Sequence, residues 1–331
     1  MSAYYSELSS QLAKIVSDFR GENVCVIGHA RPDGDCIGSS VALTRMLRSQ
    51  GVNVTLVNAD SVPETIEFLV GETPVERFSF EAVKYLPLIY VDCADEMRVG
   101  PLTSRSLSES RRLLNIDHHI SNTLFAETNL VDSDSAATCE VLAGIAFDLE
   151  WEVDAVTAQA LYVGILTDTG QFCYASTSSR VFDICSRLLK LGARPEVAAD
   201  HLFESQPLCR YKLLERYLDS LELYSDGRVC CGVLMQKDFN ETGASYEDTE
   251  AFVDYARSLK GVEIGIIVEE RKTMTKGSLR AKHADVRVDQ VAGLFGGGGH
   301  ARAAGLSSPL SVDDLKAGLL EEVDRRISAN K

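Results

Sequence analysis

The chain has 331 residues, 45% of them hydrophobic, which is typical of a globular protein with about two domains. Its formal net charge of −16 argues against a protein that wraps long duplex nucleic acid, because that binding needs a basic surface. No apolar run is long enough to span a membrane, residues 1–20 lack the pattern of a signal peptide, and the nine scattered cysteines form no CxxC pair. We therefore expect a cytoplasmic protein with reduced thiols and no membrane partner.

Short apolar runs alternate with amphipathic segments in the first part of the chain. We expect strands at residues 23–29, 52–59, 86–93 and 111–119, and helices at residues 36–51, 135–150, 154–170 and 178–193. Near-continuous apolar strands separated by helices are typical of a parallel sheet with helices on both faces. The sequence therefore predicts an α/β domain over residues 1–192.

The pattern changes after this domain. Residues 193–224 have helical spacing and are interpreted as a helical linker. Strands are then expected at residues 227–236, 261–271 and 276–283, with helices at 245–261 and 288–295. A second, smaller α/β domain is predicted over residues 225–331.

Polar residues follow the predicted strands of the first domain at the points where these strands end. In chain order they are His29, Asp33, Asp35, Asp92, Asp117, His118 and His119. Ligands of an open parallel sheet bind outside the carboxyl ends of its strands, so these side chains should converge. Asp168 ends an apolar helix and is expected to close the site from the side.

Imidazole and carboxylate groups without thiolate favour a hard or borderline divalent ion, such as Mn²⁺, Mg²⁺, Co²⁺ or Fe²⁺. The number of ligands favours two ions, which can share a carboxylate and a water molecule and lower the pKa of that water. This is the chemistry of phosphoester hydrolysis. For Asp33 and Asp35 taken alone, capping of the helix that begins near Cys36 is an alternative interpretation.

A run of four glycines, residues 296–299, lies in the second domain. Without Cβ atoms, the backbone N–H groups of Gly297, Gly298 and Gly299 can approach an anion closely, whereas a flexible loop is the alternative interpretation. Residues 265–302 hold seven Lys and Arg against four Asp and Glu, so an anion site is favoured here. Arg302, which follows the run, is a further candidate for this site.

The motifs "HARPDGD", "VDCAD", "DHH" and "TDTGQF" occur in this order and resemble the four motifs of the DHH phosphoesterases. "GSLRA" and "GGGGHARAAG" resemble the DHHA1 substrate-binding domain. The resemblance covers nearly the whole chain and is closest to the short nano-RNases that also hydrolyse 3′-phosphoadenosine-5′-phosphate (pAp). It implies a metal-dependent enzyme that degrades short oligonucleotides, pAp or both to mononucleotides, with its active site in the cleft between the two domains.

The resemblance also implies a role for each matching residue at the metal ions, for which the family generally prefers manganese. The first ion would be bound by His29 and Asp33 and the second by Asp35, His118 and Asp168, with Asp92 as the bridge between them. His119 would contact the scissile phosphate or assist the leaving group, and Asp117 would hold a histidine by a hydrogen bond.

Arg280 and His300 match the family residues that hold a substrate phosphate away from the metal ions. Arg98 follows Asp92 closely and is either a further phosphate ligand or an ordinary surface arginine. Cys36 and Cys93 would lie close to the ions, as small buried residues or as oxidation-sensitive thiols.

Other members of the superfamily fit parts of this pattern. RecJ-like single-strand exonucleases usually carry further domains, for which this chain has no room, and family II pyrophosphatases lack the "GGGGH" motif. A phosphodiesterase of c-di-AMP or of its linear product pApA is the strongest enzymatic alternative, and a non-catalytic nucleotide-binding sensor would have lost a metal ligand. The expected partners are short single strands of RNA or DNA and small nucleotides such as pAp rather than long duplexes, and a homodimer agrees with the resemblance.

Overall fold

The computed structural model describes residues 3–107 and 110–329, except for the side chain of His300. The chain folds into two compact units, one ending at Ser205 and one beginning at Gln206. Each unit has its own sheet and its own core. The domain limits expected from the sequence, and the cleft expected between the domains, stay predictions.

The first unit is built on a six-stranded sheet in which every pair of neighbouring strands is parallel. The order is β3-β2-β1-β4-β5-β6, so the direction of winding reverses between β1 and β4. The strands are β1 (Asn23–Ile27), β2 (Asn53–Asn58), β3 (Glu76–Arg77), β4 (Leu88–Val91), β5 (Arg112–Asp117) and β6 (Thr128–Val131). The predicted parallel sheet is confirmed.

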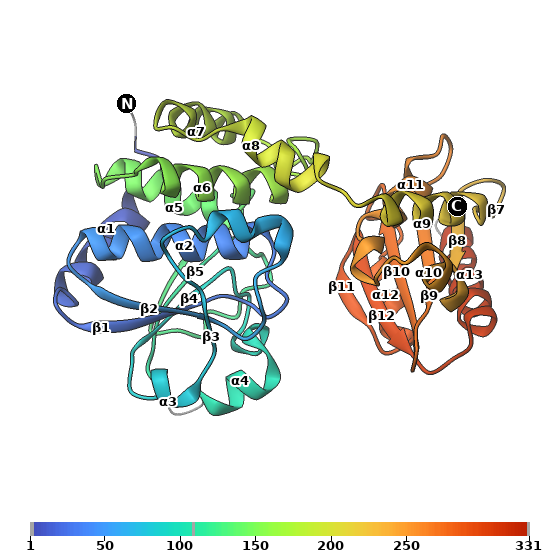
Figure 1. Ribbon diagram of the computed structural model, residues 1–331, viewed down its shortest axis with the longest axis horizontal. Coiled ribbons are helices and arrows are strands. Elements are labelled where there is room, and N and C mark those ends of the chain that lie inside the picture. The colour runs from blue at the N-terminus through green and yellow to red at the C-terminus, as the bar shows by residue number, and fades with distance from the viewer. Residues whose placement is uncertain (1–2, 108–109, 330–331) are drawn as a thin grey trace. The chain divides into compact units, whose positions relative to one another are not determined.

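Helices cover both faces of this sheet, which is why its strands are apolar on both sides (Figure 1). One face packs against α1 (Ser6–Asp18), α2 (Gly34–Ser49), α5 (Thr138–Asp148) and α6 (Ala155–Asp168), with α7 (Ser179–Lys190) outside them. The other face carries α3 (Phe80–Val83) and α4 (Pro101–Ser106). Shorter turns of helix are η1 (Glu64–Leu69), η2 (Glu96–Val99), α8 (Pro195–Ala199) and the π-helical η3 (Asp200–Glu204).

Helices α2 and α6 approach each other closely at Gly38. A Cβ atom at this position would lie 2.5 Å from the carbonyl oxygen of Ala160, which belongs to the backbone of α6. Gly38→Ala is therefore expected to lower the free energy of unfolding by about 1–3 kcal/mol, because the helices must move apart. Gly293→Ala is the control, since Gly293 also lies in a helix but has no atom within 4 Å of its Cβ position. Urea unfolding followed by circular dichroism measures both, and equal stability of the two variants would contradict the close approach.

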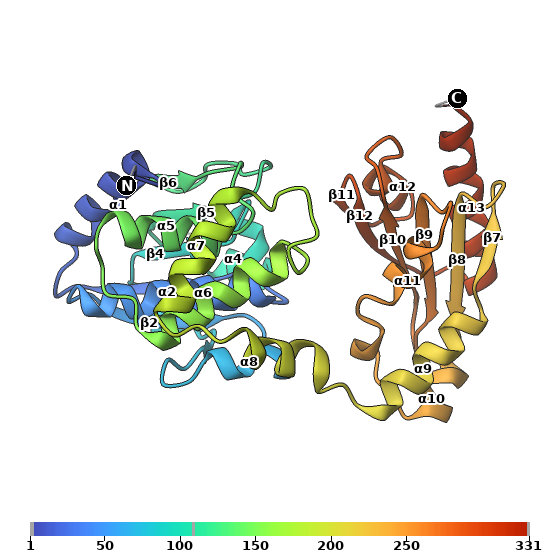
Figure 2. The same ribbon diagram turned by 90° about the horizontal axis from the view of Figure 1, so that it is seen from above.

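The second unit contains a mixed six-stranded sheet in the order β11-β12-β10-β9-β8-β7, in which only β8 and β9 run parallel. The strands are β7 (Glu222–Tyr224), β8 (Val229–Leu234), β9 (Ile264–Glu270), β10 (Thr275–Ala281), β11 (Gly298–His300) and β12 (Ala303–Ser308). One side packs against α12 (Val288–Leu294) and α13 (Val312–Ala329), and the other against α9 (Leu208–Asp219), α10 (Gln236–Thr242) and α11 (Phe252–Ser258) (Figure 2). Between α10 and α11 lies the short turn η4 (Glu247–Thr249).

Helical structure ends before residue 224, although the sequence predicted a helical linker over residues 193–224. Helix α9 ends at Asp219, and residues 222–224 form strand β7, which pairs antiparallel with β8. Ser225, Asp226 and Gly227 connect these strands with positive φ angles. The tight turn lets the polar edge strand pair with its neighbour, which a continued helix would prevent.

Candidate metal centre

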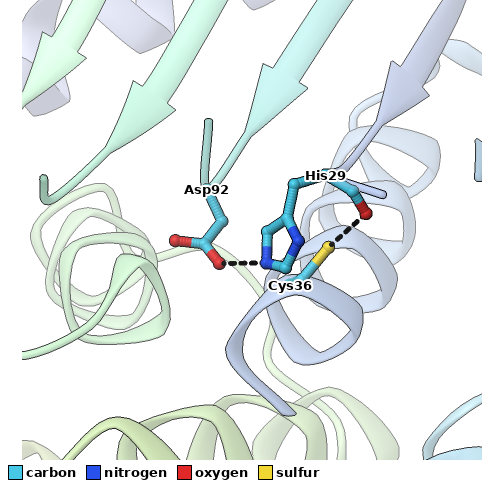
Figure 3. A group of neighbouring side chains, drawn as sticks. All are labelled: His29, Cys36 and Asp92. Carbon is cyan, nitrogen blue, oxygen red and sulfur yellow. Dashed lines mark hydrogen bonds and ion pairs between the residues drawn. The ribbon is translucent and has the colours of Figure 1, made fainter. Parts of the chain in front are cut away.

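The carboxyl ends of β1 and β4 bring two of the predicted site residues together. His29 follows β1, and Asp92 follows β4 with a backbone φ of +57°. Figure 3 shows their side chains pointing toward each other, with Nε2 of His29 3.3 Å from Oδ2 of Asp92. These are the two strands between which the order of the sheet reverses, and this is where α/β sheets bind ligands.

The end of β5 adds two histidines on the other side of Asp92. Its Oδ1 atom lies 3.6 Å from Nε2 of His118 and 3.7 Å from Nδ1 of His119. The Nε2 atom of His118 also lies 3.2 Å from Oδ2 of Asp168 and 3.9 Å from Oδ2 of Asp35. Asp92 therefore faces His29 with one oxygen and His118 with the other, which is the arrangement that a bridging ligand requires.

Hydrogen bonds from the imidazole rings leave their second nitrogen available. Nδ1 of His29 lies 3.0 Å from the carbonyl oxygen of Ala30, and Nδ1 of His118 lies 3.3 Å from that of Ser135. Because a carbonyl oxygen only accepts, both Nδ1 atoms donate, and in a neutral ring Nε2 carries the lone pair. Nε2 of His118 is buried and makes no hydrogen bond of good geometry in the described part of the chain, although Oδ2 of Asp168 lies 3.2 Å away, and this nitrogen fits a metal ligand.

Three carboxylates approach one another closely at this site. Burial raises the pKa of Asp35 well above its usual range, and the charges of Asp92 and Asp168 raise it further. Burial raises the pKa of Asp168 to about 6, against the opposing contact with His118. Burial by itself lowers the pKa of His118, but the surrounding carboxylates outweigh it and raise the pKa to about 10. A divalent cation would neutralise these carboxylates in place of the protons, so the residues present fit a metal site.

Asp33 and Asp35 differ in their local roles. Asp33 caps α2, because its Oδ1 atom accepts a hydrogen bond of 3.0 Å from the backbone N–H of Cys36, and the same oxygen lies 3.7 Å from Nε2 of His29. Asp35 is fully buried in the first turn of α2 and accepts the backbone N–H groups of Thr138 and Cys139 at 2.7 and 2.9 Å. Capping and proximity to the site therefore coexist at Asp33, whereas Asp35 does not cap α2.

Cys36 lies beside His29 and Asp92, close to the site as expected from the sequence. Among the described residues, three groups of side chains have ligand atoms within 4.8 Å of one another and could each hold a metal ion. They are His29 with Cys36 and Asp92, Asp92 with His118 and His119, and Asp35 with His118 and Asp168. The thiol of Cys36 is directed at the carbonyl oxygen of His29, 3.7 Å away (Figure 3), and burial raises its pKa to about 11. Cys93 is equally buried behind Asp92.

Asp117 positions the second histidine of the "DHH" motif. Its Oδ1 atom accepts a hydrogen bond of 2.7 Å from Nδ1 of His119, and its Oδ2 atom accepts one of 2.6 Å from Asn122. The side chain of Asn122 also donates to the carbonyl of Cys93, as does that of Asn115, so both amides support the turn after Asp92. The sequence did not predict these two asparagines, although Asn122 stands only three residues after the motif.

A network behind His118 was also missed. Arg180 of α7 donates through Nε to Glu140, 2.7 Å away, and through Nη2 to Asp132 and to the hydroxyl of Ser135 at 3.2 and 3.1 Å. The carbonyl of the same Ser135 accepts the hydrogen bond from His118. Residue spacing gives no sign of these contacts, because those of Arg180 join segments 40 or more residues apart and that of His118 with Ser135 uses a backbone atom.

The predicted phosphate ligands lie in both units. Arg98 is exposed in η2, and its carbonyl accepts a hydrogen bond from the N–H of Ala30, beside the loop that follows β1. Arg280 is partly exposed on β10, and Arg302 is exposed between β11 and β12. The side chain of His300 lies outside the described residues.

The glycine run begins in a turn and enters strand β11, so the flexible-loop interpretation is wrong for its second half. A Cβ atom at Gly297 would lie 2.3 Å from the carbonyl oxygen of Gly305, and one at Gly299 2.4 Å from that of Ala303. At Gly298, by contrast, a Cβ atom would meet nothing within 4 Å. Close packing against β12 therefore explains the glycines at positions 297 and 299, whereas Gly298 has open space beside it.

Known proteins resemble this chain over nearly its whole length. The model of the DHH family, N-terminal domain, matches residues 23–187, and that of the DHHA1 domain matches residues 226–329. The chain is 29% identical over 328 residues, 98% of its own length and 96% of the relative's, to the bifunctional oligoribonuclease and PAP phosphatase NrnA of Thermus thermophilus. It is 28% identical over 290 residues, 87% and 90% of the two lengths, to the probable bifunctional oligoribonuclease and PAP phosphatase NrnA of Streptococcus mutans.

A solved structure shares the whole fold. The exopolyphosphatase-related protein from Bacteroides fragilis matches with a TM-score of 0.89 over 97% of each chain, at 22% identity. Within the described residues no helix is both long and apolar enough to cross a membrane.

The two matched domains stand in the order that the six motifs predicted, so the chain belongs to the DHH family of phosphoesterases, hydrolases that act on phosphoester bonds.

Proposed function

We propose that this protein hydrolyses short single-stranded oligonucleotides and pAp to mononucleotides with the help of two divalent ions, Mn²⁺ foremost. The observation that carries the proposal is Asp92, whose two oxygens face His29 on one side and His118 on the other. When bound, two cations supply an activated water and neutralise the charge of the phosphate. The names of the relatives from Thermus and Streptococcus support the choice of substrates.

The remaining side chains would orient the substrate and its protons. Asp117 accepts the Nδ1–H of His119 and so fixes the orientation of that ring, which would lie beside the scissile phosphate. Arg280 and His300 would hold another phosphate, with Arg302 and Arg98 as additional cations. The proposal extends to action in the cytoplasm, to a homodimer, and to short strands rather than long duplexes, in agreement with the net charge of −16.

A turnover panel tests this function. The metal-free protein is given Mn²⁺, Mg²⁺ or Co²⁺ and then pAp, 5′-labelled RNA and DNA of two to about twenty nucleotides, pApA, c-di-AMP or pyrophosphate. We expect the highest kcat/KM with Mn²⁺ on pAp and on the shortest oligonucleotides, and calorimetry should find two bound ions per chain. Faster hydrolysis of pyrophosphate or c-di-AMP, or a preference for long DNA, would contradict the proposal.

A further inference from the structure

Strands β10, β12 and β11 bury one face and leave the other accessible. Along β10, buried residues alternate with the partly exposed Lys276, Ser278 and Arg280. The core beneath α9, α10 and α11 is formed with β8 and β9, and among the described residues none from β10, β11 or β12 belongs to it. The half of the sheet formed by β10, β12 and β11 therefore has a polar face that these helices do not bury in their core.

The backbone of two glycines, Gly305 and Gly298, forms a flat shelf next to Ser278 on this face. Gly305 of β12 pairs directly with Ser278, and Gly298 of β11 pairs directly with Gly305. Directly opposed residues of antiparallel strands point to the same face of a sheet. A Cβ atom at Gly298 would meet nothing within 4 Å, and one at Gly305 would meet only a carbonyl oxygen at 3.8 Å. The shelf thus has room for a flat group of a ligand.

The partly exposed residues of β10 form a row of Lys276, Ser278 and Arg280, with a cationic side chain at each end. Lys276 and Arg280 are four residues apart on an extended strand, which separates their backbones by about 14 Å, with Ser278 midway. This step of about 7 Å per alternate residue resembles the separation of successive phosphates in an extended single strand. The row therefore has the spacing of an oligonucleotide backbone of more than one nucleotide.

Glu269, the acidic neighbour of Lys276, is held more closely by Arg271 than by Lys276. The fully buried Glu269 receives two hydrogen bonds from Arg271, at 2.6 and 3.2 Å, whereas the ammonium of Lys276 lies 3.9 Å away. Burial lowers the pKa of Lys276, and the charges of Arg271 and Arg280 lower it further, against Glu269 and Glu250. An anion bound here would reduce the electrostatic repulsion between Lys276, Arg271 and Arg280.

We propose that the open face of β10 binds the backbone of a single-stranded oligonucleotide, with Lys276 holding a phosphate beyond the one at Arg280. A sugar and base would lie over Gly298 and Gly305, and the hydroxyl of Ser278 would face the phosphate between the two cations. The inference rests on the proposed function for its class of ligand and extends it. The row makes Lys276 a determinant of substrate length, since only a strand with at least four phosphates, one of them at the metal ions, reaches it.

The test compares substrates of different length on Lys276→Met, which keeps an unbranched side chain and removes the charge. KM is measured for pAp and for 5′-phosphorylated adenylates of two, three and five nucleotides. We expect a roughly tenfold rise for the pentanucleotide, a change below about twofold for pAp and the two shorter strands, and a salt slope smaller by about one. Lys276→Arg should restore KM, and Lys272→Met, on an exposed lysine of the same β9–β10 hairpin, should leave it unchanged.

Binding without hydrolysis separates this inference from the proposed function. The pentanucleotide is titrated calorimetrically into the metal-free protein with a chelator present, and Lys276→Met is expected to weaken binding about tenfold. If the wild type binds in this way but cleaves none of the strands, the proposed function fails and the inference stands. An equal rise in KM for every length, no rise for any length, or unchanged pentanucleotide binding would overturn the inference.

Discussion

Replacing Asp92 by asparagine is expected to lower kcat/KM for phosphoester hydrolysis by about 10³-fold or more, because two cations would lose a shared anionic ligand. Asparagine is the best substitution with which to test the role of Asp92 as a metal ligand. It keeps the size of the side chain, can still accept the hydrogen bond from Thr138, 3.1 Å away, and tolerates the backbone φ of +57°. An alanine would add backbone strain to the loss of charge.

The control for this variant is Asp226→Asn. Asp226 has the same φ of +57° but is exposed in the turn between β7 and β8, so its amide should leave activity unchanged. Turnover with Mn²⁺ and the metal content of the purified proteins are measured for both. Near wild-type activity of Asp92→Asn, with two ions still bound, would exclude Asp92 as the bridge.

The sequence predicted the part of the site that lies at strand ends. A buried apolar strand that stops at a charged residue is a strong pattern, and parallel strands bring such ends to one edge, so His29, Asp92 and His118 could be placed together before the fold was known. The supporting contacts have no such pattern. Thr138 contributes a backbone N–H and a hydroxyl from a helix start, and Ser135 contributes a carbonyl, which any residue carries.

The elements that were missed divide into two kinds. Strands β3 and β6 have two and four residues at the edges of their sheet, and their pairing with β2 and β5 depends on the fold rather than on an apolar run of their own. Helix α13 is different, because it buries Val312, Leu315, Leu319, Val323 and Ile327 at helical spacing. That pattern is present in the sequence and would have predicted the helix.

Removing the charge of Arg180 should produce a large loss of stability in the first unit. Arg180→Ala is expected to lower the free energy of unfolding by about 3–5 kcal/mol, because it leaves the fully buried carboxylate of Glu140 without its cation. The control is Arg194→Ala, which breaks an exposed ion pair with Glu196 of nearly equal length, 2.8 against 2.7 Å, and should leave the stability almost unchanged. Chemical denaturation measures both, and equal losses would show that burial of Glu140 is not the cause.

The same variant tests whether the network positions His118. Arg180 holds the hydroxyl of Ser135, whose carbonyl fixes the imidazole, so Arg180→Ala should also weaken Mn²⁺ binding by about 10–100-fold. Adding Glu140→Gln removes the unpaired charge while its amide oxygen can still accept the N–H of Ala136, so the double variant should regain most of the lost stability. Its Mn²⁺ affinity should stay low, because the hydrogen bond from Arg180 to Ser135 is still missing. If affinity returns together with stability, Arg180 acts on the fold alone and does not position the metal ligand.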